Sequence, residues 1–197
     1  MKDFFIHHSS IVDEGAQIGR GTKIWHWSHI SKDAKIGFSC TIGQNVYIGK
    51  ANIGNNVKIQ NNVSIFDNLI LEDYVFCGPS VVFTNVYNPR SEINRKKEYK
   101  NTIVKNGATL GANSTIICGI EIGEYAFIGA AALVNKNILP YALMMGVPAR
   151  QVGWMSAYGE RMNLPLIGKG EYVCPFTGDL YILNAKVIRR FKKENKN

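Results

Sequence analysis

The stretch that decides the fold is "KIGFSCTIGQNVYIGKANIG", residues 35–54, in which an Ile-Gly pair keeps returning. The first three pairs start at Ile36, Ile42 and Ile48, six residues apart, whereas the fourth starts at Ile53, after five. An α-helix cannot produce this spacing because its apolar stripe repeats about every 3.6 residues, and a plain strand alternates every two. Six residues instead accommodate a short strand followed by a tight turn.

The same period runs through most of the chain. Aliphatic or similar markers recur every six residues, apart from the step at 53 and a break over 84–103: Val12, Ile18, Ile24, Ile30, Ile36, Ile42, Ile48, Ile53, Ile59, Ile65, Leu71, Cys77, Phe83, Val104, Leu110, Ile116, Ile122, Ile128 and Val134. A small or β-branched residue usually stands two positions earlier, as at Ala16 and Val57. We expect the marker to point inward and the smaller residue to fit the corner. Gly, Asn and Asp after the markers are expected to supply the permissive backbone of the corners.

This pattern predicts an all-β fold. Three six-residue units close a triangular coil of about eighteen residues, the repeat of a parallel β-helix. Nineteen markers therefore predict about six coils. Each coil covers the next, which satisfies the hydrogen-bonding groups along its edges. The five-residue step at Ile53 is interpreted as a one-residue deletion at a corner.

The repeat resembles that of the hexapeptide-repeat acyltransferases over about residues 6–155. The resemblance implies left-handed coils, against the usual right-handed crossover of parallel strands. It also implies an acetyltransferase domain over 1–155, with an extruded loop over 84–103, and a C-terminal extension over 156–197. In the extension, "YVCPFTGDLYILNAKVIRRF" alternates around turn signals, which predicts a short β-meander that packs Cys174 and Tyr181 against the coils.

The loop "TNVYNPRSEINRKKEYKN", residues 84–101, is the first candidate for function, because long loops in compact folds are usually functional. Its cations suit a phosphorylated or carboxylated substrate. We expect Arg90, Arg95 and Tyr99 to bind that substrate. In the family this loop reaches toward a neighbouring subunit and helps to build the active site, so the resemblance also implies a homotrimer.

The catalytic candidates are Asn85 and Asp67. Antibiotic-directed members of the family carry a catalytic histidine in the loop, but the histidines of this chain all lie early, at His7, His8, His26 and His29. We expect the Asn85 amide to hold the attacking amine, since positioning alone supplies much of the rate. Asp67 stands eighteen residues before Asn85, one full coil, and should lie beneath it. Asp67 is either a general base, a charge partner for the ammonium form, or simply a corner residue.

The cofactor candidates lie in residues 109–153, which resemble the end of the acetyl-CoA-dependent members. The resemblance implies that small residues leave room there for a pantetheine arm of acetyl-CoA: Gly111, Ala112, Gly129, Ala130 and Ala131. These residues are also what tight corners require. "GVPAR", residues 146–150, matches the terminal turn of the family, in which Arg150 would contact a phosphate of coenzyme A.

Two motifs narrow the substrate class. "FCGPSVVFTNVYNPRS" (76–91) and "GVPARQVGWMS" (146–156) are similar to bacterial N-acetyltransferases that act on nucleotide-linked 3-amino sugars. The nearest group acetylates UDP-2-acetamido-3-amino-2,3-dideoxyglucuronate for lipopolysaccharide and O-antigen synthesis. There the loop asparagine contacts the sugar amine, and the thiol of coenzyme A can accept the proton. A dTDP-linked 3-amino-3,6-dideoxyhexose is the main alternative, and Arg90 or Arg95 could meet a glucuronate carboxylate.

Composition and charge bear on three other classes: membrane proteins, secreted proteins and nucleic-acid-binding proteins. No apolar run reaches the length of a membrane span, and the N-terminus lacks the apolar stretch of a signal peptide, so we expect a cytoplasmic protein without membrane insertion. The formal charge of +8 gathers at 90–100 and 189–197. Such an excess suits any polyanion. We expect a phosphorylated small molecule at the loop rather than nucleic acid, and a solvated C-terminal run.

Metal chemistry is not expected. The four cysteines form no C-x-x-C pair, which argues against zinc and disulfides. A γ-type carbonic anhydrase on the same fold needs three histidines from late coils and a neighbouring subunit. No histidine follows His29. A non-catalytic scaffold remains an alternative, but it would not need the loop, "GVPAR" and the track of small residues together.

Overall fold

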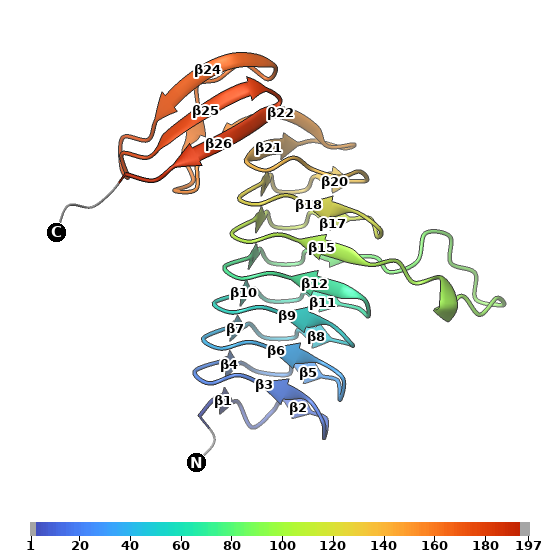
Figure 1. The fold of residues 1–197 in the computed structure, drawn as a ribbon. Helices are drawn as coiled ribbons and strands as arrows, with labels where there is room; N and C mark the ends of the chain where they lie inside the picture. Colours follow the sequence, from blue (N-terminus) through green and yellow to red (C-terminus); the bar gives the residue numbers. More distant parts are fainter. Residues whose placement is uncertain (1–2, 194–197) are drawn as a thin grey trace.

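The six-residue units form strands that are mostly two residues long, because the remainder of each unit turns a corner. In the computed structural model, which describes residues 3–193, successive strands fall on three walls in turn and stack into a left-handed parallel β-helix (Figure 1). Each strand pairs with the strand one coil later. The fold predicted from the repeat is confirmed.

We name the walls A, B and C, and the edges between them A–B, B–C and C–A. Wall A contains β1 (Phe5–Ile6), β4 (Lys23–Ile24), β7 (Thr41–Ile42), β10 (Lys58–Ile59), β13 (Phe76–Cys77), β16 (Thr109–Leu110), β19 (Phe127–Ile128) and β21 (Ala142–Met145). Wall B contains β2 (Ile11–Val12), β5 (His29–Ile30), β8 (Tyr47–Ile48), β11 (Ser64–Ile65), β14 (Val82–Phe83), β17 (Thr115–Ile116) and β20 (Leu133–Val134). Wall C contains β3 (Gln17–Ile18), β6 (Lys35–Ile36), β9 (Asn52–Ile53), β12 (Leu69–Leu71), β15 (Thr102–Val104) and β18 (Glu121–Ile122).

The number of coils depends on the wall. Within residues 3–193, walls A, B and C have eight, seven and six parallel strands respectively, against the six or so coils predicted. Wall A is longer because β1 precedes the first marker, Val12, and β21 follows the last, Val134.

The strand register confirms both the coil length and the deletion. Phe5 pairs with Lys23, eighteen residues later, as predicted. Lys35, however, pairs with Asn52, only seventeen residues later. The B–C corner between Ile48 and Asn52 has three residues instead of four, so the missing residue lies at a corner.

The core is a column of the marker residues. Ile24, Ile59 and Ile116 are fully buried, and so are members of the second register such as Val57 and Ser114. Complete burial of one such aliphatic side chain stabilises the fold by about 1.5–3 kcal/mol. At the N-terminal end the column is less protected, since Ile6, Val12 and Ile18 are only partly buried.

At the corners, the residues with positive φ are not the glycines that directly follow the markers. Positive φ falls on the third corner residue, which is often asparagine, as at Asn45 (φ 56°) and Asn62 (φ 61°). Glycines directly after the markers do not have this conformation; they are needed for close stacking. A Cβ on Gly43 would lie 2.6 Å from Asn61 Oδ1 of the next coil, and one on Gly111 would lie 2.5 Å from the Ala130 nitrogen. The expectation of permissive backbone after the markers is thus confirmed at the third corner residue, for asparagines and for glycines such as Gly15 and Gly21, but was wrong for the glycines directly after the markers.

The C-terminal end is closed by antiparallel strands. β21 pairs with β22 (Arg150–Met155), which pairs with β23 (Arg161–Met162). A separate three-stranded meander follows, β24 (Gly168–Val173), β25 (Leu180–Ala185) and β26 (Val187–Phe191), and lies over the end of the solenoid (Figure 1). This confirms the predicted meander, with Cys174 and Tyr181 both fully buried.

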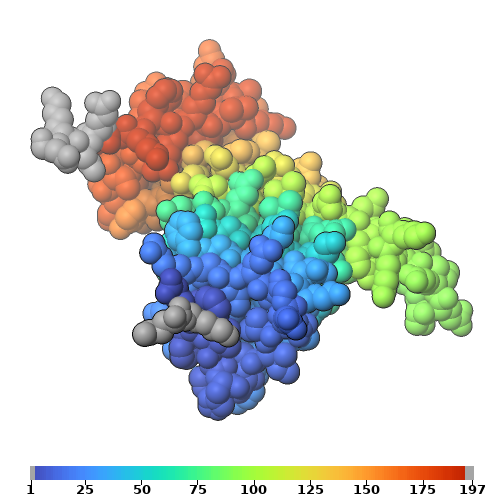
Figure 2. Space-filling model, turned by 60° about the horizontal axis from the view of Figure 1, so that its bottom comes forward, coloured from blue at the N-terminus to red at the C-terminus, as the bar shows by residue number. Residues whose placement is uncertain are grey.

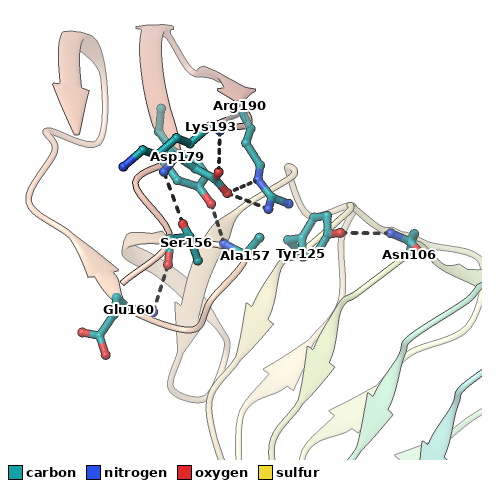
Figure 3. Close-up of polar contacts among 10 residues, drawn as sticks. Asn106, Tyr125, Ser156, Ala157, Glu160, Asp179, Arg190 and Lys193 are labelled. Carbon is teal, nitrogen blue, oxygen red and sulfur yellow. Dashed lines mark hydrogen bonds and ion pairs between the residues drawn. The ribbon is translucent and has the colours of Figure 1, made fainter. Parts of the chain in front are cut away.

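A buried ion pair secures the meander (Figure 3). The Arg190 guanidinium donates to Asp179 Oδ2 at 2.7 and 2.8 Å, and the Lys193 N–H donates to Asp179 Oδ1 at 3.0 Å. Arg190 also lies over the ring of Tyr125, in the C–A corner between β18 and β19, 5.5 Å from its centroid. Burial alone would raise the pKa of the Asp179 carboxyl, but these donors hold that pKa below its ordinary value.

The extruded loop leaves the B–C edge. It runs from the end of β14 to the start of β15 and contains one short 3₁₀ helix, η1 (Lys96–Glu98). Figure 2 shows the loop standing away from the body of the solenoid. None of the helices in the described part of the chain has the length and apolar content that a membrane-spanning helix requires.

Candidate functional site

The stem of the loop is fixed to the solenoid. The Lys100 N–H donates to the Asn85 carbonyl at 2.9 Å, which closes the two ends of the loop on each other. One coil earlier, the Asn68 side chain donates to the Tyr99 carbonyl at 3.4 Å. The Thr84 hydroxyl accepts the Cys118 N–H at 2.9 Å from the next coil. Residues at the stem therefore have set positions, although the loop beyond them projects from the body.

A groove of about 720 Å³ opens where the stem meets wall B. It is lined by Phe66, Val82, Phe83, Thr84, Asn85, Val86, Tyr87, Pro89, Ile117, Leu133 and Asn135. Most of these side chains are apolar, and no Asp, Glu, His, Lys or Cys is among them. Within residues 3–193 the groove therefore offers amide and hydroxyl groups but no side chain that would act as a base at neutral pH.

Asn85 lies half-buried in this groove. Its carbonyl is used by the stem, but its side-chain amide makes no hydrogen bond within the described residues. An amide that is held in place by its backbone and has unused donors and acceptors can orient a substrate amine.

Asp67 lies one coil below Asn85, as the repeat arithmetic predicts. Ser64 pairs with Val82, so each residue at this corner stands eighteen positions before its neighbour above. Asp67 Oδ1 accepts the Lys50 N–H at 2.9 Å. Asn61 and Asp73 make the same contact to the coil below at their own corners. Asp67 thus has a corner role that is independent of any catalytic one, and its catalytic role stays a prediction.

The predicted substrate residues Arg90, Arg95 and Tyr99 share a second hollow, of about 430 Å³, inside the loop. Arg95 is paired with Glu98, whose two carboxylate oxygens each lie 2.9 Å from its Nη1. The Arg95 Nε is buried and has no partner within the described residues. Arg90 is exposed, and its Nη1 donates to the adjacent Pro89 carbonyl at 3.5 Å. The structure thus brings these residues together, next to the groove rather than in it.

The predicted cofactor residues lie across wall B from the loop. Gly111 and Ala112 form one corner of the A–B edge, and Gly129, Ala130 and Ala131 form the corner above it. Stacking alone demands the two glycines, as the close approach at Gly111 shows. Ala130 and Ala131 are exposed beside wall B.

The turn over 146–149 completes the upper end of wall B. The Leu133 N–H donates to the Gly146 carbonyl at 3.1 Å, and the Ala149 N–H donates to the Leu133 carbonyl at 2.8 Å. Leu133 itself lines the groove, so the turn and the groove are joined through one residue. Arg150 follows the turn with an exposed side chain, whose Nη1 donates to the Ala149 carbonyl at 3.0 Å.

Sequence reasoning missed four residues of the groove: Phe66, Ile117, Leu133 and Asn135. All four stand one position before or after a marker of wall B. The signal that would find them is the repeat register itself, read for the outward positions of the wall that carries the loop. No group of three or more ligand-type side chains in the described part of the chain could hold a metal ion.

Comparisons with known proteins agree with this architecture. A family model described as the hexapeptide repeat of succinyl-transferase matches residues 34–67 and 102–136. A dTDP-3-amino-3,6-dideoxy-alpha-D-galactopyranose 3-N-acetyltransferase from Aneurinibacillus thermoaerophilus is 45% identical over 151 residues, which are 77% of this chain and 78% of the relative. The bifunctional protein GlmU of Shouchella clausii is 30% identical over 75% of this chain, but the match spans only 30% of that longer protein.

Two solved structures share the fold. LpxA, a UDP-N-acetylglucosamine acyltransferase from Bacteroides fragilis, superposes with a TM-score of 0.66 and 19% identity, over 77% of this chain and 61% of that one. A mutant GDP-perosamine N-acetyl transferase from Caulobacter crescentus, in complex with CoA and GDP-perosamine, superposes with a TM-score of 0.54 and 20% identity. The match covers 76% of this chain and 56% of that one. At this identity the structures support the architecture only.

The chain belongs to the hexapeptide-repeat acyltransferase family. The length and identity of the match to the Aneurinibacillus relative establish this membership. The family resemblance predicted from the six-residue repeat is therefore confirmed.

Proposed function

We propose that the chain transfers the acetyl group of acetyl-CoA to the 3-amino group of a nucleotide-linked 3-amino sugar. The observation that carries this proposal is the groove at the loop stem, where Asn85 offers an unused amide beside an apolar wall. The relative that is 45% identical has a dTDP-3-amino sugar in its name. We therefore place dTDP-3-amino-3,6-dideoxyhexoses first and UDP-2-acetamido-3-amino-2,3-dideoxyglucuronate second, which reverses the order expected from the sequence motifs.

The proposed reaction needs no base from the protein. The neutral sugar amine, oriented by Asn85, attacks the thioester carbonyl; a C–N bond forms and the C–S bond breaks. The departing sulfur of coenzyme A takes up the proton that the amine loses. This assignment is consistent with a groove whose lining, in the described part of the chain, includes no carboxylate, imidazole or amine. No metal is required.

We place acetyl-CoA along the upper part of wall B. Ile117 and Leu133 form an apolar floor from Asn85 toward the turn over 146–149. The exposed Ala130 and Ala131 border that floor, and the exposed Arg150 directly follows the turn. An extended pantetheine arm would follow this direction and bring the thioester to the groove.

Arg150→Ala is expected to raise the KM for acetyl-CoA more than it lowers kcat. A lost charge-assisted contact to a phosphate is worth about 1.5–3 kcal/mol, which is about 10- to 100-fold in affinity. Steady-state kinetics at saturating sugar would measure both constants. The neighbouring Gln151→Ala variant is the control, and an unchanged KM for acetyl-CoA in Arg150→Ala would contradict the assignment.

We propose a homotrimer as the active form, because the loop beyond its stem stands away from the body of the solenoid (Figure 2), where it can reach a neighbouring copy of the chain. Closed cyclic symmetry is common among soluble oligomers. Light scattering of the purified protein is expected to give three times the chain mass of 22.0 kDa. A monomer at working concentration would refute the proposal.

The function is tested by measuring thiol release from acetyl-CoA with each nucleotide sugar separately. We expect turnover with a dTDP-linked 3-amino-3,6-dideoxyhexose and an N-acetylated product by mass spectrometry. Turnover only with the UDP-linked glucuronate would restore the second candidate. Absence of thiol release with both sugars, at substrate concentrations that saturate related enzymes, would overturn the proposed function.

A further inference from the structure

A column of aromatic side chains descends wall B from the groove toward the N-terminus. It consists of Phe66, Tyr47 and His29, which we call the aromatic column. The Phe66 and Tyr47 rings are 5.9 Å apart between centroids, and the Tyr47 and His29 rings are 5.6 Å apart in an edge-on arrangement. All three side chains lie on the outer surface, and Phe66 is 40% exposed.

The six-residue repeat does not require this column. The fold does not need aromatic side chains at its outward strand positions, as wall C shows. On the first three coils of wall C the positions equivalent to His29 and Tyr47 are polar: Gln17, Lys35 and Asn52. Exposed aromatic rings in a continuous row are costly to leave in water. A ligand with a flat face would benefit from them.

The column is continuous with the groove. Phe66 lines the groove together with Asn85, and Tyr47 and His29 follow on the coils below. Parallel strands lie about 4.8 Å apart, so the three steps from β14 down to β5 cover roughly 14 Å. Because acetyl-CoA is placed above Asn85, the sugar's nucleotide must extend from Asn85 in the other direction, along the column.

The polar groups of the column have defined hydrogen-bonding roles. His29 Nε2 lies 3.2 Å from Asp13 Oδ1, and a neutral imidazole that donates there leaves Nδ1 as an acceptor. Ser31 Oγ donates to the Tyr47 hydroxyl at 3.3 Å, so the Tyr47 proton is available to a ligand. An accepting imidazole nitrogen matches the N3–H of a pyrimidine-2,4-dione, the base of both dTDP and UDP sugars.

We propose that the aromatic column is the nucleoside subsite, in which the rings of Tyr47 and Phe66 pack against a uracil or thymine base and His29 Nδ1 accepts its N3–H. This inference rests on the proposed function for the identity of the nucleotide sugar. It adds that the enzyme selects pyrimidine-2,4-diones and rejects cytosine, whose N3 is an acceptor and would face another acceptor.

Binding of nucleoside diphosphates without sugar tests the subsite independently of catalysis. Isothermal titration with dTDP and UDP is expected to show binding that weakens at least about 10-fold in Tyr47→Ala, the scale of losing one stacking partner. His29→Ala is expected to weaken the binding of both dTDP and UDP, and to reduce the preference of the protein for these ligands over CDP. Phe38→Ala is the matched control, because it removes a 49% exposed aromatic ring from the C–A edge and should leave affinity unchanged.

Folding of the variants is checked by thermal unfolding, and Tyr47→Phe, which keeps the ring, is the milder variant if Tyr47→Ala unfolds. Equal affinity for dTDP in wild type, Tyr47→Ala and His29→Ala would overturn the subsite, as would equal binding of dTDP and CDP to the wild type.

Kinetics separate this inference from the proposed function. With an active sugar, Tyr47→Ala should raise the KM for the nucleotide sugar and leave the KM for acetyl-CoA and the saturating kcat near wild type. If dTDP binding depends on the column but no amino sugar is acetylated, the proposed function fails and the subsite stands. If acetylation proceeds with unchanged KM for the sugar in both variants, the subsite fails and the function stands.

Discussion

Asn85→Ala is expected to lower kcat about 100-fold while acetyl-CoA still binds with wild-type affinity, because misplacement of the reacting groups costs on that scale. Asn85 supplies the unused amide of the groove, and its backbone carbonyl, not its side chain, closes the loop stem. The substitution therefore removes the contact to the amine without opening the loop. Stopped assays at saturating sugar, together with titration of acetyl-CoA, measure the two quantities.

Asp67→Asn is the companion variant that separates positioning from base catalysis. An asparagine keeps the Oδ1 that accepts the Lys50 N–H, so the corner should remain intact. If Asn85 positions the amine, Asp67→Asn should have the smaller effect. If Asp67 is the base, Asp67→Asn should lower kcat more than Asn85→Ala does, and it should flatten the acid limb of the pH–rate profile. Near-normal turnover in Asn85→Ala would contradict the role of Asn85 in positioning the amine and would leave the loop as a lid without a catalytic residue.

Asp179→Ala is expected to destabilise the fold by about 3 kcal/mol, the scale for removing one partner of a buried ion pair. Arg190 would keep its partly buried guanidinium against the Tyr125 ring without the carboxylate that compensates its charge. The melting temperature should fall by roughly 6–12 °C. Glu98→Ala is the matched control: it breaks an Arg–carboxylate pair at 2.9 Å whose acidic partner is 50% exposed. The free energy of unfolding should fall by less than about 1 kcal/mol in Glu98→Ala.

The same carboxylate gives stability a dependence on pH. The pKa of Asp179 is lowered in the folded state from an ordinary value of 3.8, so its contribution is fully present above that value. The contribution is lost as the pH falls through 3.8 toward the lower folded pKa. Wild type and Asp179→Ala should therefore differ most near neutral pH and converge in acid. A difference in melting temperature that stays constant down to pH 3 would contradict this account.

The sequence was sufficient for the architecture because one periodicity controls it. Every marker from Ile24 to Val134 had to point inward once the coil length was eighteen, and the deletion near Ile53 could be placed from spacing alone. Glycine roles were not accessible in this way. Whether Gly43 is needed for its φ or for the space beside Asn61 depends on the distance between coils, which composition does not contain.

The site could be predicted only in part. Asn85 and Asp67 follow from the repeat register, since both stand two residues after a marker. Phe66 and Leu133 were not assigned to a groove, because the register gives outward positions on all three walls and only those of the wall that carries the loop line it. The row formed by His29 and Tyr47 follows from the same eighteen-residue arithmetic, but nothing in the sequence marks an outward aromatic residue as part of a site.

The solenoid is closed at one end only, within the residues described. Its C-terminal coils are covered by the meander, whereas Ile6, Val12 and Ile18 of the first coil are only partly buried. In a stack where each unit contacts only its neighbours, opening begins at the least protected unit and travels inward one unit at a time. Amide protons should thus exchange in a graded order from the N-terminus. The Asn85 groove, several units from that end, would keep its shape while the first coil frays and recloses.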